Sequence, residues 1–106
     1  MRVLFLDLYC PVCQRMHLAV NRANMNLPPE YQIDVVDIYS GDPRTRVLAR
    51  IEGTNNPNMW IVPVIVYDYP VITRKLGVLT KDTERVIIYG YQGIEFLNTL
   101  INKLLR

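Results

Sequence analysis

The feature that most restricts the fold of this chain is a switch in hydrophobic periodicity near its start. Residues 3–9 form a short apolar run typical of a buried strand, and residues 11–23 carry apolar side chains at helical spacing. After a break at residues 24–29, residues 31–38 return to a β-branched pattern that favours a second strand. Because a right-handed crossover makes such strands parallel neighbours, the sequence predicts a β-α-β unit with the helix on one face.

The rest of the chain adds a helix, two strands and a final helix. Residues 42–53 begin with an Asp-Pro pair and end at a glycine, which is typical of a helix. Residues 61–69 and 85–89 are strand-like and can pair as a hairpin, and residues 94–105 have helical spacing. Residues 70–82 are longer than a tight turn needs, and the sequence does not assign them. The predicted order is β-α-β-α-β-β-α, an α/β fold with a mixed four-stranded sheet flanked by helices.

Length, charge and hydropathy limit the kind of protein this is. The chain has 106 residues, 50% of them hydrophobic, and no repeat or linker, so we expect one domain over residues 1–106. Its formal net charge is +2 and no basic run could neutralise a row of phosphates, which argues against a nucleic-acid partner. The longest apolar stretch, residues 59–67, contains a proline and is far shorter than the roughly 20 residues that span a bilayer, so no membrane partner is expected.

The N-terminal sequence bears on the compartment. The apolar run at residues 3–6 is interrupted by Asp7, with no small-residue cleavage site behind it, which is unlike a secretory signal peptide. The two cysteines are too few for a multi-bridge secreted scaffold. We therefore expect a cytoplasmic protein, and we expect it to be a monomer.

Both cysteines lie in Cys10-Pro11-Val12-Cys13, at the turn between the first strand and the first helix. Cys10 is expected at the helix N-cap, where unpaired backbone N–H groups and the positive end of the helix dipole stabilise a thiolate. Pro11 suits the first helical position, because the N–H that it lacks would have no partner there. Cys13 lies about one turn further on and is expected to be less exposed. The spacing predicts that Cys10 attacks a disulfide and that Cys13 resolves the mixed disulfide.

Two neighbours of the dithiol leave alternatives open. Asp7 is either a solvated residue at the strand end or a neighbour that opposes ionisation of Cys10. His17 extends the motif to C-x2-C-x3-H, which offers three zinc ligands, whereas structural zinc usually takes four and no second such pair follows. We assign no metal site, and zinc binding through the cysteines remains a minor alternative to redox chemistry.

Three segments carry a resemblance to a known family. Tyr9 followed by Cys-Pro-Val-Cys resembles the active-site turn of glutaredoxins and related dithiol oxidoreductases of the thioredoxin superfamily. Val62-Pro63, which opens a later strand, is similar to the cis-proline site that faces the dithiol in that superfamily. The glycine-containing turn at residues 90–93 is similar to the turn at the same point of the family fold.

The resemblance implies a thioredoxin (glutaredoxin-like) fold and a thiol–disulfide oxidoreductase acting on a disulfide-containing protein or a small thiol substrate. It implies that Val62 presents its backbone to an extended peptide or to glutathione. The dithiol needs no bound cofactor, and the electron donor is either glutathione or a reductase. Trp60 lies just before the proline, and it either lines the substrate groove or packs on the edge of the core. The residues assigned to substrate binding are Tyr9, Pro11, Val12, Trp60, Val62 and Pro63.

A second function stays open on the same residues. The chain could be a non-catalytic thioredoxin-fold module that binds a partner by strand addition or senses redox state through its dithiol. The unassigned residues 70–82 favour it, because an enlarged hairpin adds recognition surface.

Overall fold

A computed structural model describes residues 1–91, 93, 95, 97–99 and 102. The strands are β1 (Arg2–Leu6), β2 (Asp34–Asp37), β3 (Val64–Lys75) and β4 (Val78–Tyr89). The helices are α1 (Pro11–Asn24) and α2 (Arg46–Glu52), with short 3-10 helices η1 (Pro29–Tyr31), η2 (Pro43–Thr45) and η3 (Pro57–Met59). No helix in this part of the chain is long and apolar enough to cross a membrane.

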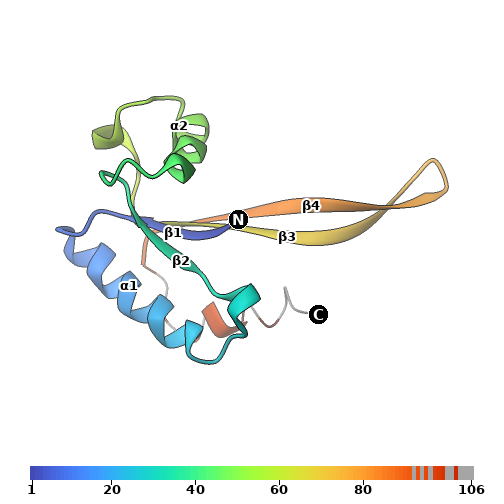
Figure 1. Cartoon of the computed structure of the whole chain (residues 1–106), viewed down its shortest axis with the longest axis horizontal. Coiled ribbons are helices and arrows are strands. Elements are labelled where there is room, and N and C mark those ends of the chain that lie inside the picture. Colours follow the sequence, from blue (N-terminus) through green and yellow to red (C-terminus); the bar gives the residue numbers. More distant parts are fainter. Residues whose placement is uncertain (92, 94, 96, 100–101, 103–106) are drawn as a thin grey trace.

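The strands form one mixed sheet in the order β2-β1-β3-β4 (Figure 1). β1 is parallel to β2, and β3 is antiparallel to both β1 and β4. The predicted α/β class, the mixed four-stranded sheet and the parallel β1-α1-β2 unit are therefore confirmed. Of the predicted final helix, Glu95, Leu97 to Thr99 and Asn102 have helical backbone, and the rest of residues 94–105 lie outside the described residues.

Alternation along β1 divides the core into two layers, because successive side chains of a strand point to opposite faces. Leu4 and Leu6 pack with buried residues of α1 and with Leu97. Val3 and Phe5 pack on the other face with Val47 and Leu48 of α2. Figure 1 accordingly shows α1 and α2 on opposite sides of the sheet. β1 is thus buried on both faces, which is why its sequence is continuously apolar rather than alternating.

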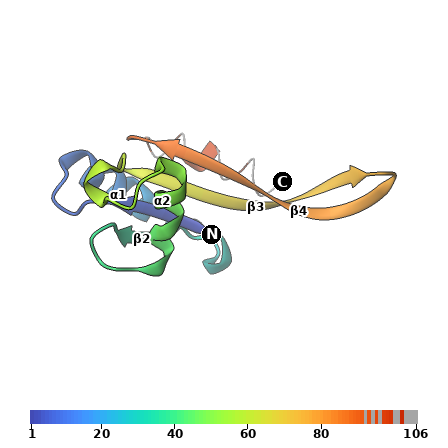
Figure 2. The same ribbon diagram turned by 90° about the horizontal axis from the view of Figure 1, so that it is seen from above.

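The structure assigns residues 70–82, which the sequence left open, to the strands themselves. β3 and β4 pair continuously from Val64–Tyr89 to Lys75–Val78, so the hairpin connection is only Leu76 and Gly77. Both turn residues have positive φ, 51° and 79°, as a two-residue hairpin turn that follows the strand twist requires. The outer half of the hairpin projects from the body as a twisted two-stranded ribbon (Figure 2).

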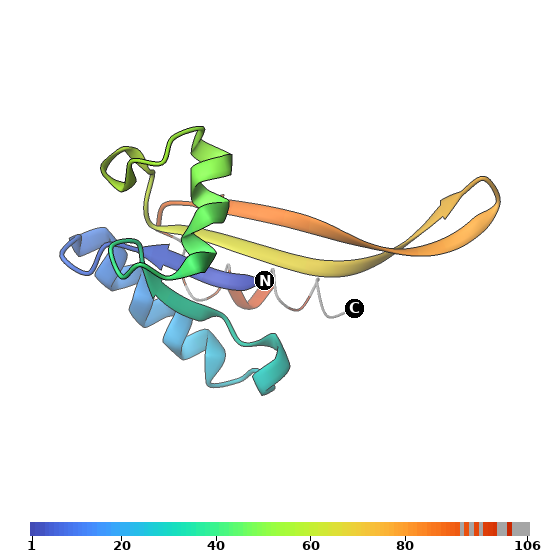
Figure 3. The same cartoon turned by 45° about the horizontal axis from the view of Figure 1, so that its top comes forward.

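β1 accompanies β3 over only part of its length. Its register with β3 runs from Phe5–Val64 to Arg2–Tyr67, and the strand beyond Tyr69 has β4 alone as a paired neighbour among the described residues. Figure 3 shows β3 and β4 continuing well past the end of β1. We refer to the paired residues 70–75 and 78–83 with their turn as the ribbon.

The turn of the ribbon generates a stability prediction. Leu76 is fully exposed and adopts φ 51°, a left-handed conformation that costs a branched residue about 1 kcal/mol and suits asparagine. We expect Leu76→Asn to slow amide hydrogen exchange in the ribbon by roughly two- to fivefold, as judged by NMR. Leu79→Asn, which changes an exposed residue of ordinary strand conformation, should not slow it. Equal effects of both substitutions would contradict this account of the turn.

Candidate dithiol site

The chain leaves β1 in a tight turn that delivers Cys10 to the start of α1. The Asp7 side chain accepts a hydrogen bond from the Tyr9 N–H at 3.0 Å, and the Asp7 carbonyl accepts one from the Cys10 N–H at 3.1 Å. The Gln14 side-chain amide donates to the Leu8 carbonyl at 2.9 Å, which ties the turn to the first helical turn. Because β1 is buried at the centre of the sheet, this end of α1 is held by the core.

Cys10 is the N-cap of α1, as the sequence predicted, with Pro11 in the first turn. Its Sγ accepts a hydrogen bond from the Cys13 N–H at 3.3 Å. That bond is the main reason why the pKa of Cys10 lies below its usual value, with a further contribution from the Val12 N–H and opposition from partial burial. A helix N-terminus favours the thiolate in just this way.

Cys13 is in the opposite situation. It is completely buried in the core cluster between α1 and the sheet, and burial raises its pKa to about 11. The neighbouring Cys10 sulfur contributes to the same rise, because two adjacent sulfurs do not readily carry charge together. Both cysteines are free thiols in this structure. Cys10 therefore ionises more readily than an ordinary cysteine, and Cys13 is held protonated at neutral pH.

Asp7 is the neighbour that opposes ionisation, the second of the alternatives left open above. Its charge raises the pKa of both Cys10 and Cys13, although burial and hydrogen bonding have larger effects on each. The same carboxylate organises the turn through its bond to the Tyr9 N–H. Asp7 therefore shapes the site and at the same time limits the thiolate.

The remaining predicted residues near Cys10 differ in exposure. The Tyr9 side chain is 90% exposed, Pro11 is exposed and Val12 is half-buried. The Val62–Pro63 peptide bond is cis, the configuration expected from the sequence, and Val62 packs against the same core cluster as Cys10. Extending the β1–β3 register by one pair sets Pro63 opposite Leu6, where β1 ends. These residues therefore lie at one end of the sheet, where β1 ends and β3 starts.

Trp60 lies elsewhere. Its ring packs against the cluster on the α2 face, and its indole N–H donates to the Thr54 carbonyl at 2.8 Å. Cys10 packs against the cluster on the α1 face, so Trp60 and Cys10 pack on different faces of the sheet, and Val62 contacts both clusters. Of the two roles considered for Trp60 from sequence, its contacts are those of packing on the edge of the core.

The zinc alternative has no geometric counterpart in the described part of the chain. No three side chains of histidine, cysteine, aspartate or glutamate converge there as a metal site. Cys10, Cys13 and His17 thus do not form a ligand set, despite their spacing in the sequence.

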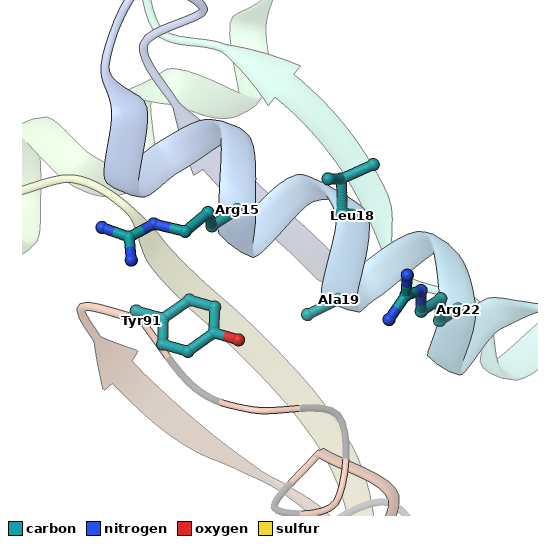
Figure 4. Close-up of a pocket in the computed structure, with 5 residues that line it drawn as sticks. All are labelled: Arg15, Leu18, Ala19, Arg22 and Tyr91. Atoms are coloured by element: carbon teal, nitrogen blue, oxygen red, sulfur yellow. The ribbon is translucent and has the colours of Figure 1, made fainter.

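A pocket of about 150 Å³ beside α1 was not anticipated from the sequence (Figure 4). It is lined by Arg15, Leu18, Ala19, Arg22 and Tyr91. The Arg15 guanidinium lies 5.8 Å from the centre of the Tyr91 ring, whereas Arg22 lies at the other end of the pocket. The two arginines recur with helical spacing, a signal that could have been noticed, but Tyr91 reaches them only through the tertiary fold.

Comparisons with known proteins do not identify the chain: no family model, no curated protein and no solved structure matches it.

The pKa difference predicts unequal reactivity of the two thiols. We expect iodoacetamide to alkylate Cys10 faster than Cys13 at pH 7, with a rate that rises as pH increases through the lowered pKa of Cys10, because the thiolate is the nucleophile. Mass spectrometry of timed samples measures both sites. Cys13→Ser should keep the fast phase and Cys10→Ser should lose it. Equal, slow labelling of both thiols would contradict the assigned ionisation.

Asp7 gives a second, directional prediction. Asp7→Asn keeps an oxygen that can accept from the Tyr9 N–H but removes the charge, so the pKa of Cys10 should fall further. Thiolate ultraviolet absorbance as a function of pH measures it. Asp37→Asn is the matched control, because Asp37 makes the same bond to the Tyr39 N–H at the end of β2 and does not contribute to the pKa of Cys10. An unchanged or raised pKa in Asp7→Asn would be inconsistent with the assignment.

Proposed function

We propose that this protein is a thiol–disulfide oxidoreductase that works through Cys10 and Cys13. The observation that carries the proposal is the asymmetry of the pair. One sulfur is partly exposed at a helix N-terminus with its pKa lowered, and the other is buried one turn away with its pKa raised to about 11. An attacking thiol and a resolving thiol need these opposite environments.

In the first step the Cys10 thiolate attacks one sulfur of a substrate disulfide. The substrate S–S bond breaks, a mixed disulfide forms between Cys10 and that sulfur, and the other substrate sulfur leaves as a thiolate that takes up a proton. The Cys13 N–H, 3.3 Å from Sγ of Cys10, stabilises the thiolate before the attack.

In the second step Cys13 releases the substrate. Once Cys10 is in a mixed disulfide it is uncharged, so its contribution to the raised pKa of Cys13 disappears. Cys13 loses its proton to the departing substrate thiolate and attacks Sγ of Cys10. The mixed disulfide breaks, a Cys10–Cys13 disulfide forms, and the dithiol has given two electrons to the substrate. Glutathione or a reductase then restores the dithiol, and no bound cofactor takes part.

The arrangement of the chain supports a thioredoxin-like, glutaredoxin-like fold as part of the same proposal. The strand order β2-β1-β3-β4 and the position of α1 directly after the β1 turn agree with the order of elements that the resemblance implies. Val62 and Pro63, at the same end of the sheet as Cys10, are the proposed site for an extended substrate backbone. The substrate is a disulfide-containing protein or a small disulfide.

One observation favours the alternative of a non-catalytic binding module. The ribbon extends the hairpin away from the dithiol, at the opposite end of the sheet, and a redox reaction at Cys10 does not need it. A measurement of catalytic turnover, rather than of binding, distinguishes the two functions.

Reduction of insulin disulfides with dithiothreitol as donor tests the proposal. Wild type should accelerate the reaction and Cys10→Ser should fall to the rate without protein, because the attacking thiolate is gone. Cys13→Ala should accumulate the mixed disulfide with substrate, visible on non-reducing gels. Met25→Ser, at the exposed far end of α1, is the matched control and should retain activity. Turnover that survives in Cys10→Ser, or is absent in wild type, would reject the oxidoreductase and favour the module.

The redox potential of the pair decides the direction of the reaction. Dithiol proteins of this kind span roughly −270 to −120 mV, and a more stable thiolate shifts the pair towards an oxidant. The Cys13 N–H stabilises the Cys10 thiolate, and burial and Asp7 oppose it, so the pair can act in either direction. Equilibration with glutathione buffers measures the potential.

A further inference from the structure

The ribbon has features that the dithiol does not explain. Two paired strands without a covering layer are marginally stable in water, yet this ribbon exposes large apolar side chains. Ile72 is 71% and Leu79 is 65% exposed, and both lie on the same face of the ribbon as Pro70 and Arg74. Exposed apolar side chains on an unsupported ribbon indicate a surface that is covered in the working protein.

The ribbon also presents an open backbone edge on β3. The Asp68 N–H donates to the Met1 carbonyl, and the Pro63 carbonyl accepts from the Gly90 N–H on the β4 side. The direction of the backbone N–H and carbonyl groups alternates along a strand. In β3 these groups therefore point towards β1 at even-numbered residues and towards β4 at odd-numbered residues. Beyond Arg2, where β1 starts, Ile72 and Arg74 therefore present unpaired N–H and carbonyl groups within the described structure, and Pro70 presents a carbonyl.

The middle of the opposite edge, residues 81–85 of β4, is protected against pairing with itself. Residues 81–85 read Lys-Asp-Thr-Glu-Arg. If two copies of β4 pair antiparallel about a two-fold axis at one of these charged residues, that residue lies directly opposite its own copy. An axis at Thr83 opposes Lys81 to Arg85 and Asp82 to Glu84. Every such register puts like charges directly across from each other, which is destabilising and is a known way to block edge association.

The β3 edge lacks this protection. In a two-fold register centred on Ile72, Ile72 meets its own copy, Val71 meets Thr73 and Pro70 meets Arg74. Tyr69 meets Lys75 of the second copy, beside Glu84, whose carboxylate accepts from the Tyr69 hydroxyl at 3.1 Å. The central pair is thus apolar, the cations Arg74 and Lys75 meet the uncharged Pro70 and Tyr69, and no like charges are opposed.

We propose that two copies of this chain associate through the β3 edges of their ribbons. The strands pair antiparallel over residues 69–75 with Ile72 on the two-fold axis, giving a continuous β4-β3-β3-β4 sheet. Ile72 exchanges backbone hydrogen bonds with its own copy, and the Pro70 carbonyl accepts from the Arg74 N–H of the second copy. A two-fold interface uses the same patch twice, as this self-complementary edge does. The inference departs from the monomer expected from sequence and does not depend on the function of the dithiol.

Sedimentation velocity over a range of concentrations tests the proposal with a matched pair of variants. Wild type should shift from monomer to dimer as concentration rises. Ile72→Arg should weaken dimerisation at least about tenfold, because two cations meet at the axis. Leu79→Arg is the control: it also places an arginine opposite a basic residue within the hairpin, Arg74, just as Ile72→Arg does with Lys81. Leu79 lies on β4, away from the axis, so its variant should dimerise like wild type.

A cysteine cross-link tests the register independently of stability. In a Cys10→Ser, Cys13→Ser background, Ile72→Cys should form an intermolecular disulfide under mild oxidation, because paired positions across an antiparallel ladder are within bridging distance. Leu79→Cys should not cross-link at a comparable rate.

The opposing outcomes are distinct. A wild-type protein that remains monomeric at all concentrations, equal loss of dimer in both arginine variants, or cross-linking of Leu79→Cys as fast as Ile72→Cys would each overturn the proposal. Monomeric protein that sediments with anionic phospholipid vesicles would instead assign the ribbon to a membrane surface.

Discussion

The proposed chemistry of this protein depends on one hydrogen bond, from the Cys13 N–H to Sγ of Cys10. It exists because Cys10 caps α1, and α1 starts directly after Cys10 because β1 is anchored in the middle of the sheet with core on both faces. The same arrangement buries Cys13 and raises its pKa to about 11. The position at which α1 starts therefore sets the environments of both cysteines, lowering the pKa of Cys10 and raising that of Cys13.

The molecule has two regions, the body and the ribbon, that are stabilised in different ways. In the body, each face of the sheet is covered, and the alternation of β1 sorts its side chains between the α1 and α2 layers. In the ribbon, no other element of the described residues covers β3 and β4, which are held by their ladder and by side-chain pairs such as Lys75–Asp82 and Thr73–Thr80. The body positions the dithiol, and the ribbon offers an edge. The proposed reaction and the proposed dimer thus use separate surfaces.

Sequence reasoning succeeded where the signal is local. The β1-α1-β2 unit follows from periodicity, and the Cys10 N-cap follows from the switch to helical spacing and from Pro11, which suits the first helical position. It did not resolve Trp60, whose position beside Pro63 in the chain does not reveal which face of the sheet it packs on. Residues 70–82 stayed unassigned because Pro70 weakens a strand pattern unless its missing N–H faces an open edge, and only the length of β1 decides that.

The sequence by itself determined the α/β order of the first elements and the place of the dithiol at a helix start, with one cysteine at the N-cap and the other about one turn inside the helix. Tertiary structure decided the rest. The raised pKa of Cys13 comes from burial under the sheet, the effect of Asp7 from the fold of its turn, and the open β3 edge from β1 ending before β3 does. These properties depend on which groups surround an atom in space, and neighbours along the chain do not specify them.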